Sequence, residues 1–316
     1  MGLEYERVED IDLESADKVS DLIAQMGEGG GFMASHLSKA LDTLEQMERD
    51  ECLKFLSFPA CIVSTGCRGV IKTMVEKGLV DVIITTCGTL DHDLARAWAF
   101  YCRGSFTADD AELHKKKVHR LGNIFIPMEN YGIALEKGLR PIFEKLYEEK
   151  KVWGVRELIE RVGKSLDDKK SILYWATRNE VPIYVPGIFD GAFGSQLWLF
   201  WQDHRDFSID PFRDEQELSD LVFGCRKSGA LIVGGGISKH HTIWWNQFKD
   251  GLDYGVYITT AMEWDGSLSG ARLREGISWG KVKEEGEEIT VEGEATMLLP
   301  FLIKGLIERL GIRRVK

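Results

Sequence analysis

The chain has 316 residues, 44% of them hydrophobic and 29% charged, which excludes an intrinsically disordered protein. Its net charge of −11 leaves no basic footprint, so we expect no nucleic-acid partner. We also expect no membrane partner, because no apolar run approaches the roughly 20 residues that span a bilayer. The N-terminus lacks the features of a signal peptide, and the six cysteines show no metal-ligand spacing. These features predict a cytoplasmic protein with free thiols and no metal site.

The first half of the chain predicts helices around one buried strand. Residues 1–30 indicate an N-terminal arm with a helix over 13–26, which the glycines at 27–31 end. Apolar residues three or four apart predict a second helix with one buried face, at Leu37, Leu41, Leu44 and Met47. After a helix over 70–77, the continuous apolar run 80–86 is typical of a buried parallel strand.

The second half of the chain alternates strands and helices. Strands are expected at 123–127, 182–186, 230–233, 254–259 and 289–291. Helices separate these strands, and a last helix is expected over 297–310. This alternation predicts an α/β fold with a single domain over 1–316. We expect a doubly wound, mostly parallel, Rossmann-like sheet flanked by helices.

Four of the predicted strands end in residues that suit a ligand. These ends are Thr-Thr-Cys-Gly (85–88), Asp-Gly (190–191), Gly-Gly-Gly (234–236) and Thr-Thr-Ala (259–261). Glycine lets the backbone approach a ligand closely, and threonine hydroxyls and free N–H groups at helix starts can hold phosphate or ribose. Since the carboxyl ends of parallel strands meet at one edge, we predict a dinucleotide-sized ligand there. A purely structural glycine-rich edge is the alternative, because the usual GxGxxG fingerprint is absent.

Lys281, which ends the segment Ser-Trp-Gly-Lys, is the first candidate for a reactive side chain. Trp279 and the Gly280 backbone can strip water from its amine, which favours the neutral nucleophile. Such a lysine forms imines with carbonyl or iminium carbons. The alternative is a solvated lysine at the start of a strand, which is the usual fate of an isolated lysine.

Two adjacent histidines, His240 and His241, open the helix after the triple glycine. On a helix they point about 100° apart, so they cannot both bind one metal through a single face. One is expected to be packed, and the other could serve as a base in the site. Trp244 and Trp245 could belong to the core or stack on a cation.

Three acidic residues are weaker candidates. Glu275 could hold a cationic substrate or shuttle protons, or it could be a surface charge paired with Arg272 or Arg274. Asp190 and Asp265 lie in glycine-rich loops, where aspartate is a common turn residue.

Several of these segments resemble a known family. GGGISKHH (234–241), DYGVYITTAMEWDGSLSGA (253–271) and SWGK (278–281) are similar to segments of deoxyhypusine synthases, in an archaeal form. The resemblance extends over nearly the whole chain, through SHLSKAL, IVSTG, VDVIITTCG, RLGNIFIP, LYWATRNEVPIYVPGIFDG and EATMLLPFL. SWGK together with the preceding DGSLSGA is its most specific part.

The resemblance implies an NAD-dependent transferase that forms an imine on Lys281. In this family the 4-aminobutyl group of spermidine passes to a specific lysine of the translation initiation factor 5A precursor. His240 is then implied as a base, with Tyr257, Glu275 and Trp279 in the amine site. NAD contacts are implied at Ser64, Thr86, Cys87, Gly88, Asp190, Gly235, Thr260, Ala261, Asp265, Ser269 and Glu294. A homotetramer with sites at dimer interfaces is implied as well.

Four positions depart from the eukaryotic members of this family. His92 replaces a glutamate, Ser195 and Leu268 replace aspartates, and Trp244 replaces an asparagine. Three carboxylates expected to neutralise the ammonium groups of spermidine are thus absent, which predicts a changed amine pocket that includes His92 and Trp244. Agmatine, whose guanidinium could stack on Trp244, is an alternative donor. A free-amine acceptor, as in a homospermidine synthase, and a non-catalytic NAD-binding module are further alternatives.

Overall fold

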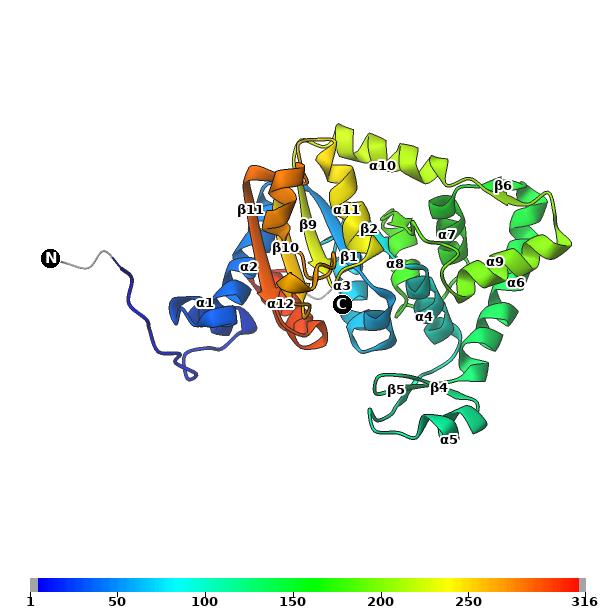
Figure 1. Cartoon of the computed structure of the whole chain (residues 1–316), viewed down its shortest axis with the longest axis horizontal. Coiled ribbons are helices and arrows are strands. Elements are labelled where there is room, and N and C mark those ends of the chain that lie inside the picture. Colours follow the sequence, from blue (N-terminus) through cyan, green and yellow to red (C-terminus); the bar gives the residue numbers. More distant parts are fainter. Residues whose placement is uncertain (1–4, 313–316) are drawn as a thin grey trace.

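The central element of the fold is a six-stranded parallel sheet. The computed structural model describes residues 5–312 and is shown in Figure 1. The strand order is β11-β10-β9-β1-β2-β7, and every neighbouring pair is parallel. The strands are β1 (Leu53–Phe58), β2 (Val82–Thr85), β7 (Ile183–Tyr184), β9 (Ser228–Val233), β10 (Leu252–Thr259) and β11 (Val282–Glu292). The predicted α/β class with a mostly parallel sheet is confirmed.

Helices cover both faces of the sheet. Alternate residues of a strand face opposite sides, so Leu56 belongs to one apolar core and its neighbour Phe55 to another. The first core is packed by α1 (Val19–Glu28), α2 (Phe32–Arg49), α3 (Cys67–Glu76), α4 (Cys87–Trp98) and α12 (Ala295–Arg309). It is extended by α6 (Gly132–Glu149), α7 (Val155–Lys164), α8 (Ile172–Arg178) and α9 (Ala192–Asp203). The second core is packed by α10 (Phe212–Gly224) and α11 (Ile237–Gln247).

The central strand β1 is not indicated by the sequence pattern. Its residues, Leu-Lys-Phe-Leu-Ser-Phe, are interrupted by a lysine and a serine, which hides the continuous apolar run of a buried parallel strand. The structure provides partners for the lysine, because Lys54 Nζ donates to the Glu48 carboxylate at 2.8 Å and to the Gly78 carbonyl at 3.1 Å. A polar residue at the start of the strand is therefore compatible with a place at the centre of the sheet.

The strand expected at 123–127 forms, but it lies outside the parallel sheet. It is β5 (Ile124–Pro127), and it pairs antiparallel with β3 (Cys102–Arg103) and β4 (Val118–Leu121). Gly122, with a φ of +60°, makes the tight turn that reverses the chain from β4 to β5. With α5 (Asp110–Lys115), these strands form a small lobe next to α4 (Figure 1). A separate parallel pair joins β6 (Val152–Trp153) and β8 (Ser208–Ile209).

The edge strand β11 is much longer than the expected 289–291. It spans Val282–Glu292 and pairs with β10 along most of that length. Val282, Ile289 and Val291 are buried, whereas the glutamates between and after them give the segment the look of a solvated loop. These glutamates are Glu284, Glu285, Glu287, Glu288 and Glu292. An edge strand tolerates such a sequence because one of its sides has no strand neighbour.

The N-terminal arm extends away from the body (Figure 1). The first helix begins at Val19 instead of residue 13, and residues 5–18 precede it as an exposed segment (Figure 1). The Glu9 N–H donates to the Glu28 carbonyl at 3.4 Å, which ties the arm to the end of α1. Within residues 5–312, no helix combines the length and the apolar character needed to cross a membrane.

Candidate active site

The carboxyl ends of the parallel strands contact one another along one edge of the sheet. After β1, the Ala60 N–H donates to the hydroxyl of Thr86, which follows β2, at 3.1 Å. After β9, the Gly234 N–H donates to the Ile258 carbonyl of β10 at 2.8 Å. Beyond β7, Gly191 packs so closely on α4 that a Cβ there would lie 2.7 Å from a thiol of that helix. The four strand ends that were expected to line a ligand site therefore share one edge.

Gly235, in the turn after β9, lies directly against the loop that carries Ser269. A Cβ on Gly235 would lie 2.1 Å from the Ser269 hydroxyl oxygen, so the turn has no room for a side chain here. Its neighbours Gly234 and Gly236 have φ values of +67° and +78°, which favour glycine. The turn therefore presents bare backbone at the start of α11, next to the loop over 261–271.

Two helices begin at this edge without a side-chain cap. The N-cap residue of α4 is Thr86, and its side chain accepts no hydrogen bond from the first turn of that helix. The N-cap residue of α11 is Gly236, which has no side chain to serve as a cap. Carboxylates already cap the two other helices that start here, with Asp91 on α9 and Glu294 on α12. Free N–H groups and the helix dipole attract anions, so the starts of α4 and α11 can take a phosphate.

Lys281 lies among aromatic rings next to α11, and its backbone stands at the amino ends of β10 and β11, where its carbonyl accepts from the Leu252 N–H at 3.1 Å. It follows the 3₁₀ helix η4 (Leu273–Trp279), and its Nζ is 5.1 Å from the ring centre of Trp279 and 6.0 Å from that of Trp244 on α11. His240, one turn before Trp244, stacks on the same indole with ring centroids 5.6 Å apart. Trp279 is 67% exposed and Trp244 is 41% exposed. In one copy of the chain, Trp279 therefore shields Lys281 from water less than expected.

The two adjacent histidines point to different sides of α11, as expected. His240 faces Lys281, and its pKa is lowered below the usual value by burial and then by the charge of Lys281. His241 faces α10, where its Nε2 lies 3.6 Å from the Glu215 carboxylate, and burial lowers the pKa of His241 to about 4. Both imidazoles are therefore mostly neutral at neutral pH, and His240 is the one beside the lysine.

Glu275 lies on η4 with an exposed side chain. The two arginines considered as its surface partners bind other carboxylates, Arg272 that of Glu292 and Arg274 that of Glu263. The interpretation of Glu275 as half of such a surface pair is therefore wrong. Its carboxylate remains a candidate for holding a cation near Lys281.

Tyr257 is buried inside β10, and its side chain belongs to the support of the site. Its hydroxyl donates to the Ser269 carbonyl at 2.5 Å, and the Thr259 hydroxyl donates to the same oxygen at 3.0 Å. Tyr257 therefore holds the loop over 261–271, and within one chain it does not present its hydroxyl to a substrate.

The other residues expected to contact a dinucleotide lie along the edge with different access. Four have exposed side chains: Asp190, Thr260, Asp265 and Glu294. Ser64 is buried and donates to the Cys61 carbonyl at 2.7 Å. Cys87 is also buried, and burial raises its pKa to about 12, so only its backbone can contact a ligand. Gly88 and Ala261 likewise offer backbone groups.

His92 belongs to a closed polar cluster on α4, which covers the face of the sheet opposite to α11. Its Nδ1 lies 2.9 Å from the Tyr101 hydroxyl, and its ring packs against Tyr131. Burial lowers the pKa of His92 to about 4. Among the described residues, the structure brings Lys281, His240 and the two indoles together, but it does not bring His92 to them.

Two functional positions were not expected from the sequence. Asp91 accepts hydrogen bonds from two N–H groups at the start of α9 and from the Tyr131 hydroxyl, and thereby fixes the loop that carries Asp190. Lys239 lies on the buried stripe of α11 with Thr242 and Asn246, although it is a lysine. The three-to-four-residue spacing of that stripe is a signal that could have identified Lys239 as a buried charge.

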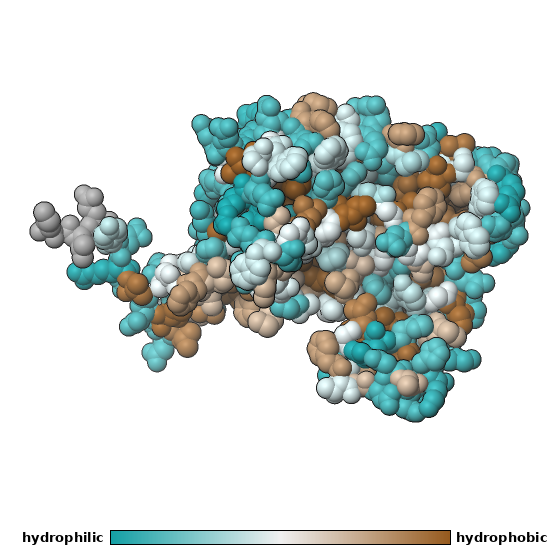
Figure 2. Space-filling model, in the orientation of Figure 1, coloured by the Kyte–Doolittle hydropathy of each residue, from teal (hydrophilic) through white to brown (hydrophobic). Residues whose placement is uncertain are grey.

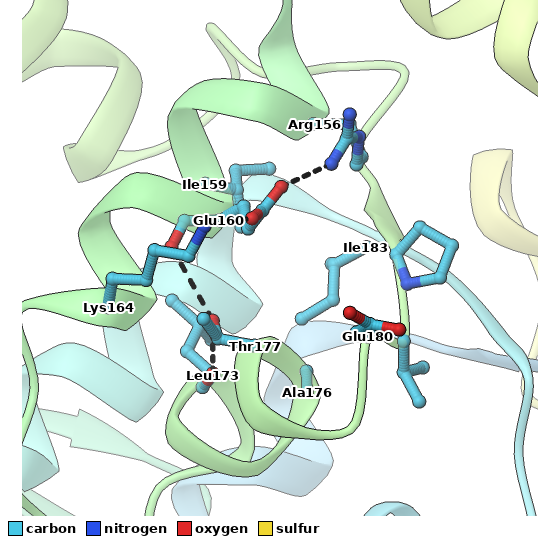
Figure 3. A pocket seen from close by; sticks show the side chains of 11 residues that line it. Arg156, Ile159, Glu160, Lys164, Leu173, Ala176, Thr177, Glu180 and Ile183 are labelled. Atoms are coloured by element: carbon cyan, nitrogen blue, oxygen red, sulfur yellow. Dashed lines mark hydrogen bonds and ion pairs between the residues drawn. The ribbon is translucent and has the colours of Figure 1, made fainter.

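A cavity of about 330 Å³ lies at the opposite edge of the sheet. Figure 3 shows Arg156, Glu160 and Lys164 of α7 on one side of it and Glu180, in the turn before β7, on another. Arg156 and Lys164 both pair with Glu160 across its wall. The segment 181–183 leads into β7, so this cavity adjoins the amino end of that strand, and its lining includes no residue of the Lys281 cluster.

The fold and the site together define a class of protein. It is a doubly wound α/β protein whose strand ends suit a dinucleotide and whose Lys281 lies beside a neutral imidazole and two indoles. Such an arrangement can form and transfer an imine.

Comparisons with known proteins identify the family. A model of the deoxyhypusine synthase family matches residues 21–306. Proteins named probable deoxyhypusine synthase are 51% identical in Thermoplasma volcanium over 296 residues and 50% identical in Picrophilus torridus over 298, each covering 94% of this chain and 96% of the relative. One from Ignicoccus hospitalis is 50% identical over 309 residues, 96% of each chain. The chain belongs to the deoxyhypusine synthase family, and the resemblance seen in the sequence is confirmed.

A solved structure agrees with this assignment at the level of the fold. A crystal structure from Entamoeba histolytica, also named as a deoxyhypusine synthase, superposes with a TM-score of 0.63. The two chains share 20% sequence identity, and the match covers 94% of this chain and 96% of the other.

Proposed function

We propose that this chain transfers the 4-aminobutyl group of spermidine to a specific lysine of the translation initiation factor 5A precursor, with NAD as cofactor and Lys281 as the imine-forming residue. The observation that carries the proposal is the Lys281 amine, which lies beside Trp279 and beside His240 and Trp244 of α11, the helix that begins at the edge suited to a dinucleotide. Membership of the deoxyhypusine synthase family supports it.

The residues of the edge fit NAD. The uncapped starts of α4 and α11 can attract its pyrophosphate, and the bare turn around Gly235 permits close approach. The exposed carboxylates of Asp190 and Asp265 can accept hydrogen bonds from ribose hydroxyls. Bound there, NAD would take a hydride from the donor amine and later return one to the product.

Lys281 would carry the aminobutyl fragment between donor and acceptor. Its amine adds to the imine carbon of the oxidised donor, a new C–N bond forms, and diaminopropane leaves as the old bond breaks. Neutral His240 can accept a proton from the secondary amine of the donor and return it to the leaving amine. The acceptor lysine then adds to the same carbon and displaces Lys281, which regenerates the enzyme's amine.

The identity of the donor depends on groups that hold its cationic end. Glu275 and the exposed face of Trp244 are the candidates next to Lys281. Ser195 donates its hydroxyl to the Gly191 carbonyl, and it brings no charge in place of the aspartate of the eukaryotic pattern. Because Trp244 offers a flat ring 41% exposed, a planar guanidinium can stack on it, and agmatine is the second candidate donor.

We also propose that copies of the chain assemble into a homotetramer. Figure 2 shows apolar patches on the surface of one copy, and several large side chains are open to water. Trp264 is 83% exposed and Trp198 is 55% exposed, in addition to the two indoles near Lys281. Burial of such rings between copies would stabilise the assembly and complete the shielding of Lys281.

The test is intact-mass spectrometry of the factor 5A precursor after incubation with this protein and NAD. Spermidine and agmatine are supplied in separate tubes. We expect an aminobutyl adduct on the precursor in the tube with spermidine. An adduct in the tube with agmatine, and none in the tube with spermidine, would mean that agmatine is the donor. Mass photometry of the same sample tests the tetramer.

Lys281→Ala should abolish the adduct with either donor. Lys283→Ala is the matched control, because Lys283 lies two residues away and its Nζ pairs with Asp253 at 2.6 Å. Substantial transfer by Lys281→Ala would contradict the mechanism. An adduct on a free amine such as putrescine, with none on the precursor, would favour a homospermidine synthase. No adduct with any acceptor would leave a non-catalytic NAD-binding protein.

A further inference from the structure

Lys239 is a charged residue in a place where charge is unfavourable. Its side chain is only 1% exposed and lies on the inner stripe of α11. Its Nζ donates to the Leu268 carbonyl at 2.8 Å and to the Ala271 carbonyl at 2.5 Å. The same nitrogen lies 3.8 Å from the ring centre of Tyr257. The lysine is therefore fully engaged inside the protein, with its head group under the loop over 261–271.

Four consecutive carbonyls of that loop are held by side chains. Lys239 takes the first and the fourth, those of Leu268 and Ala271. Tyr257 and Thr259 take that of Ser269, and Arg272 takes that of Gly270 at 2.8 Å. The stretch 268–271, which belongs to no helix or strand, is thus fixed residue by residue from beneath, and Lys239 provides two of the anchors.

The anchored stretch includes the residue that touches the glycine turn. Ser269 lies between the two carbonyls that Lys239 holds, and its hydroxyl is so close to Gly235 that no Cβ fits there. A shift of the loop would move Ser269 and Asp265 relative to the turn after β9. Ser269 and Asp265 are expected contacts of the dinucleotide, so the position of Lys239 determines the shape of the surface that would contact the dinucleotide.

Several charges surround the Lys239 head group. Burial lowers the pKa of Lys239 to about 7, the carboxylate of Glu275 raises it, and the cations of Arg272 and Lys281 lower it. His240 is its neighbour on α11, and Tyr257 faces it from β10. The two hydrogens of a neutral amine suffice for the two carbonyls. When the loop opens and water reaches the amine, the lysine would regain a proton.

We propose that Lys239 is a positioning residue that holds the loop over 261–271 closed onto the carboxyl ends of β9 and β10. The part of this proposal that concerns cofactor binding rests on the proposed function. The part that concerns the loop stands on the contacts of the chain alone.

The test compares Lys239→Met with the wild type by hydrogen–deuterium exchange, without any ligand. Methionine keeps the length of the side chain and removes both donors. We expect the protection factors of amides in 262–271 to fall by about tenfold or more, because hydrogen bonds to a charged or strongly polar group of this kind are worth at least that factor. Lys249→Met is the matched control, since Lys249 follows α11 and contacts Cys225 instead of the loop.

A second readout separates the positioning role of Lys239 from simple packing. Protection factors of the same amides in the wild type should rise between about pH 6 and about pH 8.5, by at most tenfold per pH unit, because deprotonation favours the closed loop. Lys239→Met should lack this rise and Lys249→Met should keep it. If Lys239→Met does not fold, the wild-type series decides: a rise supports the proposal and a flat profile overturns it. Unchanged protection in a folded Lys239→Met also overturns it.

NADH fluorescence titration then tests the cofactor part. We expect Lys239→Met to bind NADH about tenfold or more weakly than the wild type, with Lys249→Met unchanged. If the loop loosens in Lys239→Met but the wild type itself does not bind NADH, the role of Lys239 in holding the loop stands and the assignment of NAD as cofactor is wrong. If the loop loosens in Lys239→Met and its NADH affinity equals that of the wild type, the proposed link between Lys239 and cofactor binding is overturned.

Discussion

Two charged triplets follow strand ends on opposite faces of the sheet, and they use their charges differently. On α4, the triplet Asp91-His92-Asp93 is closed, since Asp91 caps α9 and Asp93 caps α8 and pairs with Arg68 at 2.6 Å. On α11, the triplet Lys239-His240-His241 is half open, because Lys239 is buried on carbonyls while His240 faces Lys281 between exposed indoles. A hydrogen-bond network in which every donor and acceptor is paired fixes the geometry of its residues. A group that takes part in a reaction needs a donor or acceptor that is still free for the substrate. We therefore expect α4 to do structural work and the proposed reaction to take place beside α11.

Asp93→Asn breaks the closed triplet and should have the largest effect. The Asp93 carboxylate is fully buried and accepts hydrogen bonds from Arg68, from the Ser171 hydroxyl and from two N–H groups of α8. Removal of its charge leaves the Arg68 guanidinium undercompensated, so we expect the free energy of unfolding to fall by roughly 3–5 kcal/mol. Urea unfolding measures it. Asp110→Asn, which weakens an exposed pair with Arg120, should cost far less, because water screens that pair, and equal losses would refute the distinction.

His240→Ala and His241→Ala sharpen the division within the open triplet. We expect His240→Ala to slow the proposed transfer by about 10²–10⁴-fold, as for the loss of a general base, with little change in melting temperature. His241→Ala should retain most of the transfer and lower the melting temperature, because it empties a packed position against Trp245. Single-turnover adduct formation and thermal unfolding measure the two effects. The reverse result would assign the base to His241.

Because of His92, the free energy of unfolding should depend on pH. Burial lowers its pKa to about 4, whereas an unfolded histidine titrates near 6.5. The unfolded state therefore binds more protons between these values, and stability should fall as the pH falls from about 6.5 to about 4, by up to roughly 3 kcal/mol. His92→Gln, which keeps an acceptor for the Tyr101 hydroxyl, should lose this part of the slope. Urea unfolding at about pH 7 and about pH 4.5 would show the difference, and parallel slopes would speak against it.

Trp244→Ala should produce the smallest effect, confined to the donor. A cation on an accessible indole is worth about 1–2 kcal/mol, so we expect the KM for the amine donor to rise by about 5–30-fold. Trp244→Phe should give a smaller rise, because the benzene ring is a weaker partner for a cation. Steady-state kinetics with spermidine and with agmatine measure both variants. A fall in kcat with an unchanged KM would mean that Trp244 acts on His240 instead of the donor.

Local patterns predict much of this fold. Helices with a clear apolar face, such as α2, and continuous apolar strands, such as β2, lie within a few residues of their expected positions. β1 and β11 could not be recognised in the same way, because Lys54 of β1 is tolerated through tertiary partners and the glutamates of β11 through edge exposure. The placement of β5 in a separate antiparallel lobe depends on the turn at Gly122, whose consequence for the sheet order is not local.

The candidate site was predictable where its residues lie in one motif. Segments around the glycine turn and around Lys281 contain His240, Trp244 and Trp279, and the structure brings these side chains together. The spacing on α11 can mark Lys239 as buried, but the partners of Asp91 and Lys239 lie about 100 and about 30 positions away along the chain, so no local pattern reveals what these side chains hold. His92 shows the converse, since its position in a motif predicts a pocket, whereas Tyr101 and Tyr131 enclose its ring in the structure.

The acidic strand β11 also has a consequence for how molecules of this protein meet. An exposed edge with free backbone groups is a template on which another chain can add a strand, and this leads to aggregation. Glu284, Glu285 and Glu287 line β11 with exposed charge, so two such edges repel each other before their backbones can pair. Assembly is thereby directed to other surfaces, and a crowded solution of the protein is protected from growth of the sheet beyond β11.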